Sequence, residues 1–300
     1  MNHTIRKAVV MALAGSTVAL GGISSALASN TMYNTFNAFA TPTPTDGDPL
    51  AGGAQPTTDG WVWGGIGGTK AAPIAPPGPA KFVGIDGSKT PQRRTPFGYK
   101  GSAPVNWAVQ LGCSDSGVIS QADSFTRYGV YADIDTAKGA WSDASTLGAQ
   151  GWKHNLDIGL FKSKVDTDVT LSVAGLTQAG TQFGFTIFKG MDTTSVAYGH
   201  HGGWNAGNNT SGVTADSLVP GTSFTTKDVV AYSVGGTSPS NLNQIVFHAK
   251  ADKVYTIVVG GYRNGLWNDT ADGYVLTATT AAPNKGCSYD DKHDDDHRDH

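Results

Sequence analysis

Sulfur ligands are scarce in this chain of 300 residues. Its two cysteines are Cys113 and Cys287, and the methionines beyond the N-terminal segment are Met32 and Met191. Two cysteines paired with each other leave no thiolate for structural zinc, an iron–sulfur cluster or blue copper. No C-x-x-C-H motif for covalent haem is present. The sequence therefore disfavours every metal site that depends on soft sulfur ligands.

Strong charge of one sign is also lacking. The chain has 21 basic and 24 acidic residues. The segment after Cys287 carries six Asp against one Lys and one Arg, which leaves the rest of the chain near neutral. No basic patch indicates nucleic-acid binding. After the N-terminal segment, no apolar run is long enough to predict a transmembrane helix.

The N-terminal segment has the pattern of a secretory signal peptide. Basic Arg6 and Lys7 precede an apolar run over residues 8–23, and small residues end the segment at Ala28. A retained membrane anchor is disfavoured because the run is short, rich in Gly and Ser, and not followed by stop-transfer charges. We expect residues 1–28 to be removed and the protein to be secreted. In the oxidising environment outside the cytoplasm, Cys113 and Cys287 are expected to form a disulfide.

Motifs for common hydrolytic chemistry are absent. The chain contains neither G-x-S-x-G nor H-E-x-x-H, so a nucleophile elbow and a zinc protease site are not indicated. Paired carboxylates for glycoside hydrolysis stay open, drawn from Asp133, Asp135, Asp157, Asp166 and Asp168. The last two are typical of turn residues that open a strand, with a structural calcium site as the alternative. We expect a protein that is not an enzyme.

Composition divides the mature chain into three parts. Residues 29–105 are rich in Gly, Pro, Thr and Ala and are expected to form an extended arm, irregular over residues 29–60. Residues 106–287 contain short β-prone runs between turn residues. Residues 288–300 are rich in Asp and His and are expected to be a disordered tail, either solubilising or binding metal weakly.

The strand pattern predicts an all-β fold. In "VTLSVAG", Val169, Leu171 and Val173 alternate with polar residues, and "FGFTIFKG" alternates in the same way. Such runs recur with Gly, Asn and Asp between them, without an amphipathic helix of ordinary length. This pattern is typical of an antiparallel β-sandwich or jelly roll.

Four histidines lie in the predicted β-rich part: His154, His200, His201 and His248. Imidazole is a common metal ligand, whereas the intact indole of Trp152 offers an N–H donor and no lone pair. If "GWKHNLDIGL" is extended, Trp152 and His154 point to the same face. His200 and His201 lie together in the Gly-flanked segment "YGHHGGWN", a setting in which loops often present ligands.

These segments resemble the MopE/CorA family, surface copper(I)-binding proteins of methane-oxidising bacteria. The resemblance covers roughly residues 120–280 and rests on the W-x-H pair, the "GFTIFKG" strand, the "GHHGGWN" loop and a closing "YTIVVGGYRNG…DGYVLTAT" hairpin. The hairpin is less specific, because it is also similar to prepeptidase C-terminal modules of bacterial proteases.

The resemblance implies a copper(I) site. In that family the Trp of W-x-H is oxidised to kynurenine, and its new amino nitrogen binds copper(I) together with two histidines. Carried over, Trp152 is the modified residue and His154 is one ligand, while the second is His200 or His201, with His248 as a further option. The resemblance also implies a dihaem peroxidase-like partner that oxidises Trp152, and a location at the outer cell surface.

Two other interpretations stay open. Trp152 and His154 can also be a packed aromatic residue beside a hydrogen-bonded histidine. The chain is then a carbohydrate- or protein-binding β-sandwich of the cell envelope, with Trp141, Trp204 and Trp267 on its binding face. In the second interpretation, the chain is an accessory module of a secreted hydrolase. We expect the copper-binding function and copper(I) as the bound ion.

Overall fold

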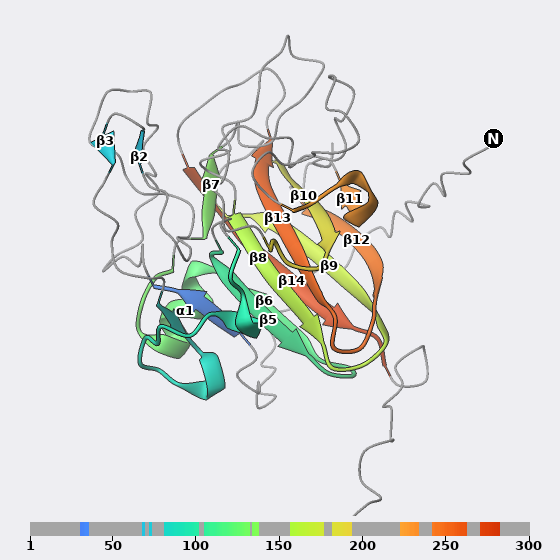
Figure 1. The fold of residues 1–300 in the computed structure, drawn as a ribbon, viewed down its shortest axis with the longest axis horizontal. Coiled ribbons are helices and arrows are strands. Elements are labelled where there is room, and N and C mark those ends of the chain that lie inside the picture. Colours follow the sequence, from blue (N-terminus) through green and yellow to red (C-terminus); the bar gives the residue numbers. More distant parts are fainter. Residues whose placement is uncertain are drawn as a thin grey trace, which may run out of the picture.

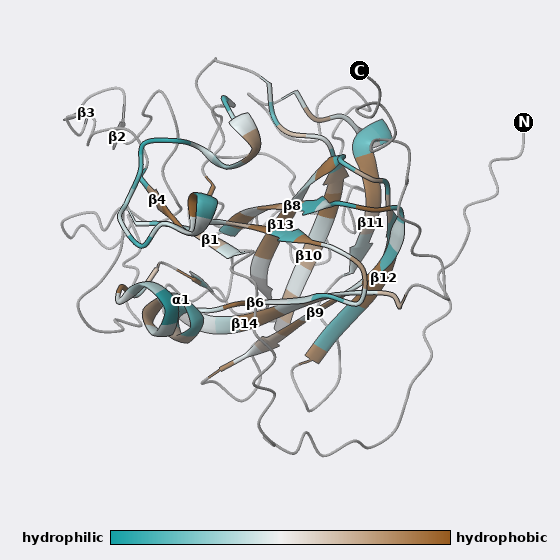
Figure 2. Cartoon of the chain, turned by 90° about the horizontal axis from the view of Figure 1, so that it is seen from below, coloured by the Kyte–Doolittle hydropathy of each residue, from teal (hydrophilic) through white to brown (hydrophobic). Residues whose placement is uncertain are grey.

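The fold is a sandwich of two β-sheets packed face to face (Figures 1 and 2). A computed structural model describes residues 31–35, 68–69, 72–73, 81–101, 105–132, 134–137, 157–176, 182–193, 223–233, 242–262 and 271–282. Trp152, His154, His200 and His201 lie outside these ranges, as do residues 1–28, the expected signal peptide, and residues 288–300.

The first sheet has seven strands. In spatial order they are β11 (Val229–Ser233), β10 (Gln182–Lys189), β13 (Val254–Tyr262), β8 (Asp157–Ser163), β5 (Trp107–Leu111), β1 (Thr31–Asn34) and β4 (Phe82–Val83). Among the described strands, β5 and β8 pair in parallel, and the other neighbours in this sheet pair antiparallel. The parallel pair places two strands distant in sequence side by side at the centre of the sheet.

The second sheet has five strands. Four follow the order β12 (Leu242–Ala249), β9 (Thr167–Gly175), β14 (Ala271–Thr280) and β6 (Ser116–Ile119), and β7 (Asp135–Ala137) pairs with the start of β14. The remaining described elements are β2 (Gly68–Thr69), β3 (Ala72–Pro73), α1 (Gln121–Tyr128), and the 3-10 turns η2 (Ile85–Gly87), η3 (Pro96–Gly98) and η6 (Thr226–Asp228).

The core lies between the two sheets, and the predicted all-β sandwich is confirmed. Phe161 of β8 packs edge-on against Phe247 of β12, with ring centroids 5.8 Å apart, and Tyr255 of β13 contacts both rings. The alternation read from β9 is also confirmed, because Val169, Leu171 and Val173 are fully buried. Cross-sheet aromatic packing therefore holds the layers together.

Two short segments of the expected arm, Thr31–Asn34 and Phe82–Val83, contribute strands to the sandwich. Thr31–Asn34 pairs with β5 on one side and with β4 on the other, with Tyr33 opposite both Trp107 and Val83. Tyr33 and Phe82 are buried. Strands of four and two residues are too short to show alternation, so the Gly- and Pro-rich composition around them hid their role.

One helix, α1, was not predicted. The Ser120 hydroxyl caps its N-terminus by accepting from the Asp123 amide at 3.0 Å, and Gly129 ends it with a left-handed φ of 77°. The sequence "SQADSFTRYG" contains both cap signals, which could have located it. No helix within the described ranges is both long and apolar enough to cross a membrane.

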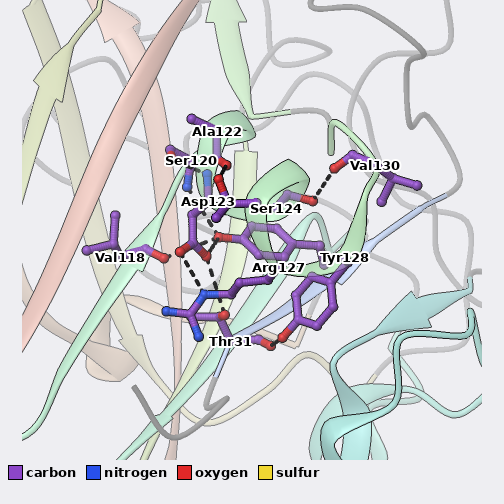
Figure 3. A network of polar contacts seen from close by, with 11 residues as sticks. Thr31, Val118, Ser120, Ala122, Asp123, Ser124, Arg127, Tyr128 and Val130 are labelled. Carbon is purple, nitrogen blue, oxygen red and sulfur yellow. Dashed lines mark hydrogen bonds and ion pairs between the residues drawn. The ribbon is translucent and has the colours of Figure 1, made fainter. Parts of the chain in front are cut away.

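Helix α1 fastens β1 to the sandwich through polar contacts (Figure 3). The Tyr33 hydroxyl donates to Asp123 Oδ2 at 2.7 Å, and Arg127 Nε donates to Asp123 Oδ1 at 2.7 Å. The Tyr128 hydroxyl donates to the carbonyl of Thr31 at 2.6 Å. Two side chains of one short helix, Asp123 and Tyr128, thus hold a strand that lies about 90 residues earlier in the sequence, and Arg127 holds Asp123 in place.

Alkaline pH is expected to destabilise the fold through two buried tyrosines. Burial, followed by the charge of Asp123, raises the pKa of Tyr33 well above its ordinary value, and burial followed by Asp157 does the same for Tyr274. Because the unfolded chain ionises at pH about 10 while the folded chain does not, this stability is present below pH about 10 and is lost as pH rises further. Denaturant unfolding between pH 8 and pH 11 measures the loss.

Tyrosine absorbance provides the check on that cause. The two buried hydroxyls should ionise together with unfolding, after the exposed tyrosines have titrated. If all ten tyrosines titrate near pH 10 while the fold stays intact, the burial of Tyr33 and Tyr274 does not control alkaline stability.

Cys113 lies between β5 and β6 and is not a free thiol. Its neighbour Ser114 donates a backbone hydrogen bond to the carbonyl of Ala281 at 3.0 Å, just after β14. Cys287 follows six residues later in the sequence and lies outside the described residues. The Cys113–Cys287 pairing stays a prediction.

Reduction is expected to lower the free energy of unfolding by about 2 kcal/mol or more, because the cross-link would close a long loop in the unfolded chain. Unfolding with and without reductant measures the change, and peptide mapping without reductant identifies the bond. A free thiol at Cys287 in the protein isolated without reductant from its native host would refute the pairing.

Candidate metal-binding region

The structure describes the strand ends that flank the predicted ligands in sequence, here called the anchors, and does not describe the ligands themselves. The segment with Trp152 and His154 enters β8 at Asp157, three residues after His154. The segment with His200 and His201 lies between β10 and η6. The positions of these two anchors therefore limit where the predicted ligands can meet.

The first anchor is a set of hydrogen bonds at the start of β8. Asn106 Nδ2 donates to Asp157 Oδ1 at 2.9 Å, and Asn106 Oδ1 accepts from the amide of Ile158 at 3.0 Å. The amide of Asn106 also donates to the carbonyl of Ile158 at 2.8 Å. The Asn106 side chain thus continues the parallel pairing of β5 and β8 by one residue.

The second sheet takes part in the same anchor. The Tyr274 hydroxyl of β14 donates to Asp157 Oδ2 at 2.6 Å, and Trp107 Nε1 donates to the Tyr274 oxygen at 3.2 Å. All four side chains are essentially inaccessible to solvent. We name Asn106, Trp107, Asp157 and Tyr274 the Asp157 lock.

In the Asp157 lock, Trp107 donates to Tyr274, and Tyr274 and Asn106 both donate to Asp157. Indole can only donate, so the Tyr274 oxygen accepts from Trp107 and its own proton goes to Asp157. Asn106 likewise turns its amide hydrogens toward Asp157, because its oxygen accepts from Ile158. Each carboxylate oxygen of Asp157 thus accepts one hydrogen bond from a side-chain donor. Burial, then the charge of Asp157, raises the pKa of Tyr274, so the hydroxyl stays a donor.

The alternation of side chains between the two faces of a strand predicts which face of the sheet carries Trp152 and His154. Phe161 belongs to the core between the sheets, whereas Ile158 and Leu160 point to the outer face of the seven-stranded sheet and are buried there. Trp152 and His154 share the even parity of Ile158 and Leu160. If the chain before β8 is extended, both side chains lie on the outer face.

The second anchor lies on the same outer face. Ser223 donates through its amide to Asp192 Oδ1 at 3.0 Å, and the amide of Thr193 donates to Ser223 Oγ at 3.0 Å. These bonds bring together the two ends of the segment that contains His200 and His201. Phe224 stacks on Phe188 with ring centroids 4.8 Å apart. Ile187, the neighbour of Phe188, points into the core, so Phe188 marks the outer face of β10.

The two anchors are separated along the sheet. Asp157 pairs with Val259 and Val259 with Phe185, so the start of β8 is level with the middle of β10. Gly190 lies about 15 Å further along the strand direction and two strands, about 10 Å, to the side. His200 is eight residues beyond Asp192, and an extended chain of eight residues spans about 27 Å. If the chain before Asp157 continues as a strand, His154 lies about 10 Å further from Gly190 than Asp157 does, so His200 or His201 reaches it only with the intervening residues almost fully extended.

His248 lies elsewhere. It is exposed on the outer face of the five-stranded sheet, and its Nδ1 is 2.8 Å from Asp168 Oδ1 of the neighbouring strand. Asp168 follows the turn after β8, so this pair is at the end of β8 opposite Asp157. A whole sandwich layer and about 20 Å of strand separate His248 from the start of β8. The structure thus disfavours His248 as the second ligand of His154.

Among the other acidic residues considered from sequence, Asp133 lies outside the described residues, and Asp135 lies far from Asp166 and Asp168. Asp166 accepts from Lys250 Nζ at 2.8 Å and from the amide of Ala251 at 2.6 Å, and these contacts, Lys250 first, lower its pKa. Asp135 accepts from Gln121 Nε2 at 3.1 Å inside the sandwich. Within the described ranges, no cluster of three or more His, Cys, Asp or Glu residues could hold a metal ion.

Sequence reasoning missed three members of the lock. Asp157 was noted as one of several carboxylates, whereas Asn106, Trp107 and Tyr274 carried no predicted role. Their partners are between 51 and 167 residues apart in the chain. The glycine that follows Asp157 and Ile158 is a weak sequence signal for close packing at this strand, since Gly159 leaves room for the Trp107 indole.

No family model and no curated protein matches the chain in sequence. Among solved structures, CorA, a surface-associated copper-binding protein important in Methylomicrobium album BG8 copper acquisition, is 12% identical with a TM-score of 0.32, covering 58% of this chain and 99% of its own. The secreted protein MopE of Methylococcus capsulatus, in which an oxidised tryptophan facilitates copper binding, is 11% identical with a TM-score of 0.30, covering 82% and 97%.

The pre-peptidase C-terminal domain of a Bacillus anthracis collagenase is similar at 12% identity and a TM-score of 0.24, covering 60% of this chain and 100% of that domain. All three likenesses are too low to assign a function. The function proposed below rests on the residues of this chain.

Proposed function

We propose that the chain is a secreted copper(I)-binding protein of the outer cell surface that captures copper for uptake and is not an enzyme. Its ligands are His154, one of His200 and His201, and the amino nitrogen of an oxidised Trp152. The observation that carries the proposal is the W-x-H spacing three residues before a strand whose start is held by the Asp157 lock.

The arrangement of the anchors supports this ligand set. If the chain before Asp157 continues as a strand, Trp152 and His154 share the outer-face parity of Ile158 and Leu160, and the segment of His200 and His201 starts and ends on that face. Two imidazoles and one aromatic amine form a nitrogen set of low coordination number. Such a set suits copper(I) better than metals that prefer octahedral oxygen ligands.

An intact indole cannot bind copper, so Trp152 has to be opened by an external oxidant. A dihaem peroxidase-like partner is the class of protein that the family resemblance implies for this oxidation. We propose that the modification occurs after export and before tight copper binding.

Analysis of the protein from its native host tests the proposal. Mass spectrometry should find a small mass gain on the peptide that contains Trp152. Trp152→Phe keeps an aromatic ring but excludes the amine, so it should bind copper(I) more weakly than the wild type from the same host. If the variant binds as tightly as the wild type, the amine is not a ligand and the site is at most a pair of histidines.

The alternative of a carbohydrate- or protein-binding module rests on Trp141, Trp204 and Trp267, all outside the described residues. No observation on the described faces favours it. Glycan binding that persists after copper chelation would support it instead.

A further inference from the structure

Basic side chains are concentrated in one described segment at an edge of the sandwich. Residues 81–101 contain five basic residues and a single acidic residue, Asp86. All five basic residues are exposed to solvent: Lys81, Lys89, Arg93, Arg94 and Lys100. The whole chain has a net charge of −3, so an average over the sequence hides this segment. We call residues 81–101 the basic lobe.

Backbone hydrogen bonds fold the first part of the basic lobe into a hairpin. Phe82 and Gln92 exchange both backbone hydrogen bonds, at 2.8 and 2.9 Å. Lys81 and Arg93 flank this pair, so they lie beside each other at the base of the hairpin. The lobe includes β4, the last strand of its sheet, which lies at the opposite edge from β11 (Figure 2).

The second part of the lobe folds back on the hairpin. Arg94 Nη1 donates to Asp86 Oδ2 at 2.8 Å, with both side chains about 70% exposed, so this ion pair is weak. The Thr95 hydroxyl donates to the carbonyl of Tyr99 at 2.6 Å, which brings Lys100 close to Arg94. The basic residues therefore gather on one small lobe with an excess of positive charge.

The surface of the basic lobe lacks the side chains that anchor protein partners. Interfaces between proteins depend on exposed aromatic or large apolar residues. Of the lobe's own aromatic residues, Phe82 and Tyr99 are buried and Phe97 is half-buried. Among the described residues, the exposed large apolar side chains all lie outside the lobe: Phe125, Leu176, Val230, Tyr232, Leu242 and Val246. The lobe offers charge and hydrogen-bond donors, which suit a partner with a dense layer of negative charge.

We propose that the basic lobe attaches the protein to an anionic membrane surface by binding lipid phosphate groups. Lys and Arg both donate to phosphate oxygens, and Arg can form two parallel hydrogen bonds with them. Each basic residue close to an anionic bilayer strengthens binding about fivefold. This inference goes beyond the proposed function, because it concerns attachment and requires none of the proposed copper ligands.

Sedimentation with lipid vesicles, with copper chelated, tests the attachment. The protein should bind vesicles of phosphatidylglycerol and phosphatidylcholine in equal parts, but not vesicles of phosphatidylcholine alone. Binding should fall as salt is added, because the Debye length shrinks from about 10 Å at about 0.1 M to about 3 Å at about 1 M. Combined Lys81→Gln, Lys89→Gln and Arg93→Gln leaves the Arg94–Asp86 pair intact and should weaken binding about 100-fold.

A matched control removes three positive charges elsewhere. Combined Lys164→Gln, Lys227→Gln and Lys253→Gln changes exposed lysines outside the lobe, so it should bind the anionic vesicles as the wild type does. Equal weakening in the two triple variants would mean that net charge drives binding, and it would overturn the proposal. Equal binding to neutral and anionic vesicles would overturn it too.

Soluble heparin separates a membrane from an acidic polysaccharide as the partner. If the protein binds heparin but no anionic vesicle, the lobe recognises an anionic polymer and the membrane proposal fails. Loss of vesicle binding would leave the copper ligands untouched, and loss of copper binding in a protein that still binds vesicles would leave the role of the lobe intact. The two proposals therefore fail separately.

Discussion

His154→Ala is expected to abolish tight, stoichiometric copper(I) binding. His154 is the one histidine between Cys113 and His200 in the sequence, so no other imidazole close to it in the chain can take its place. The loss should exceed the roughly 10- to 100-fold that removal of an outer-shell contact costs. Competition with a chromophoric cuprous chelator, with ascorbate as reductant, measures the affinity and the number of ions bound.

Two controls show whether the loss is specific. His248→Ala removes a histidine that pairs with Asp168 on the far sheet, and it should leave tight binding unchanged. Deletion of residues 288–300 removes three histidines and six aspartates, and it should remove only weak additional binding. Unchanged stoichiometry in His154→Ala, or loss of the tight ion in the deletion, would move the site away from β8.

The regular part of the fold could be predicted from short-range patterns. In β9, Val169, Leu171 and Val173 alternate with polar residues and burial follows that alternation, whereas in β10 the residues between the alternating apolar ones are buried as well. Alternation is a local property, because each side chain reports which face it occupies. The same pattern therefore predicted strands, their faces and the sandwich class from sequence alone.

Other parts depend on contacts that no local pattern reveals. β1 has four residues and gains its place from Tyr33, whose hydroxyl reaches Asp123 about 90 residues away. β8 is buried on both faces, so its strand does not alternate. Helix α1 is eight residues long and was hidden among strands, although its caps are visible in the sequence.

The candidate site divides in the same way. The spacing of Trp152 and His154 is visible in the sequence, whereas the Asp157 lock joins β5, β8 and β14 across both sheets. The structure also shows the position of His248, which the sequence leaves open: it lies in the five-stranded sheet, whereas β8 belongs to the seven-stranded sheet. Which of His200 and His201 completes the site stays a prediction.

Gly159→Ala is expected to destabilise the protein by about 3 kcal/mol or more. Gly159 pairs with Trp107 in the parallel ladder, and a Cβ at this position would lie inside 3.0 Å of three carbon atoms of the indole. Trp107 is fully buried and donates to Tyr274, so its ring cannot turn away without breaking that bond. Overpacking a rigid ring falls at the upper end of the usual 1–3 kcal/mol cost. Urea unfolding at neutral pH measures it.

Gly112→Ala is the matched control, because a Cβ there meets no atom within 4 Å. It should change stability by no more than about 1 kcal/mol, and in the stabilising direction if the backbone accepts alanine.

Trp107→Leu combined with Gly159→Ala tests the cause, since the smaller side chain leaves room for the new methyl group. The double variant should be more stable than the sum of the two single losses predicts, by about 0.5–3 kcal/mol. Strict additivity would mean that Gly159 is required for a reason other than the indole that covers it.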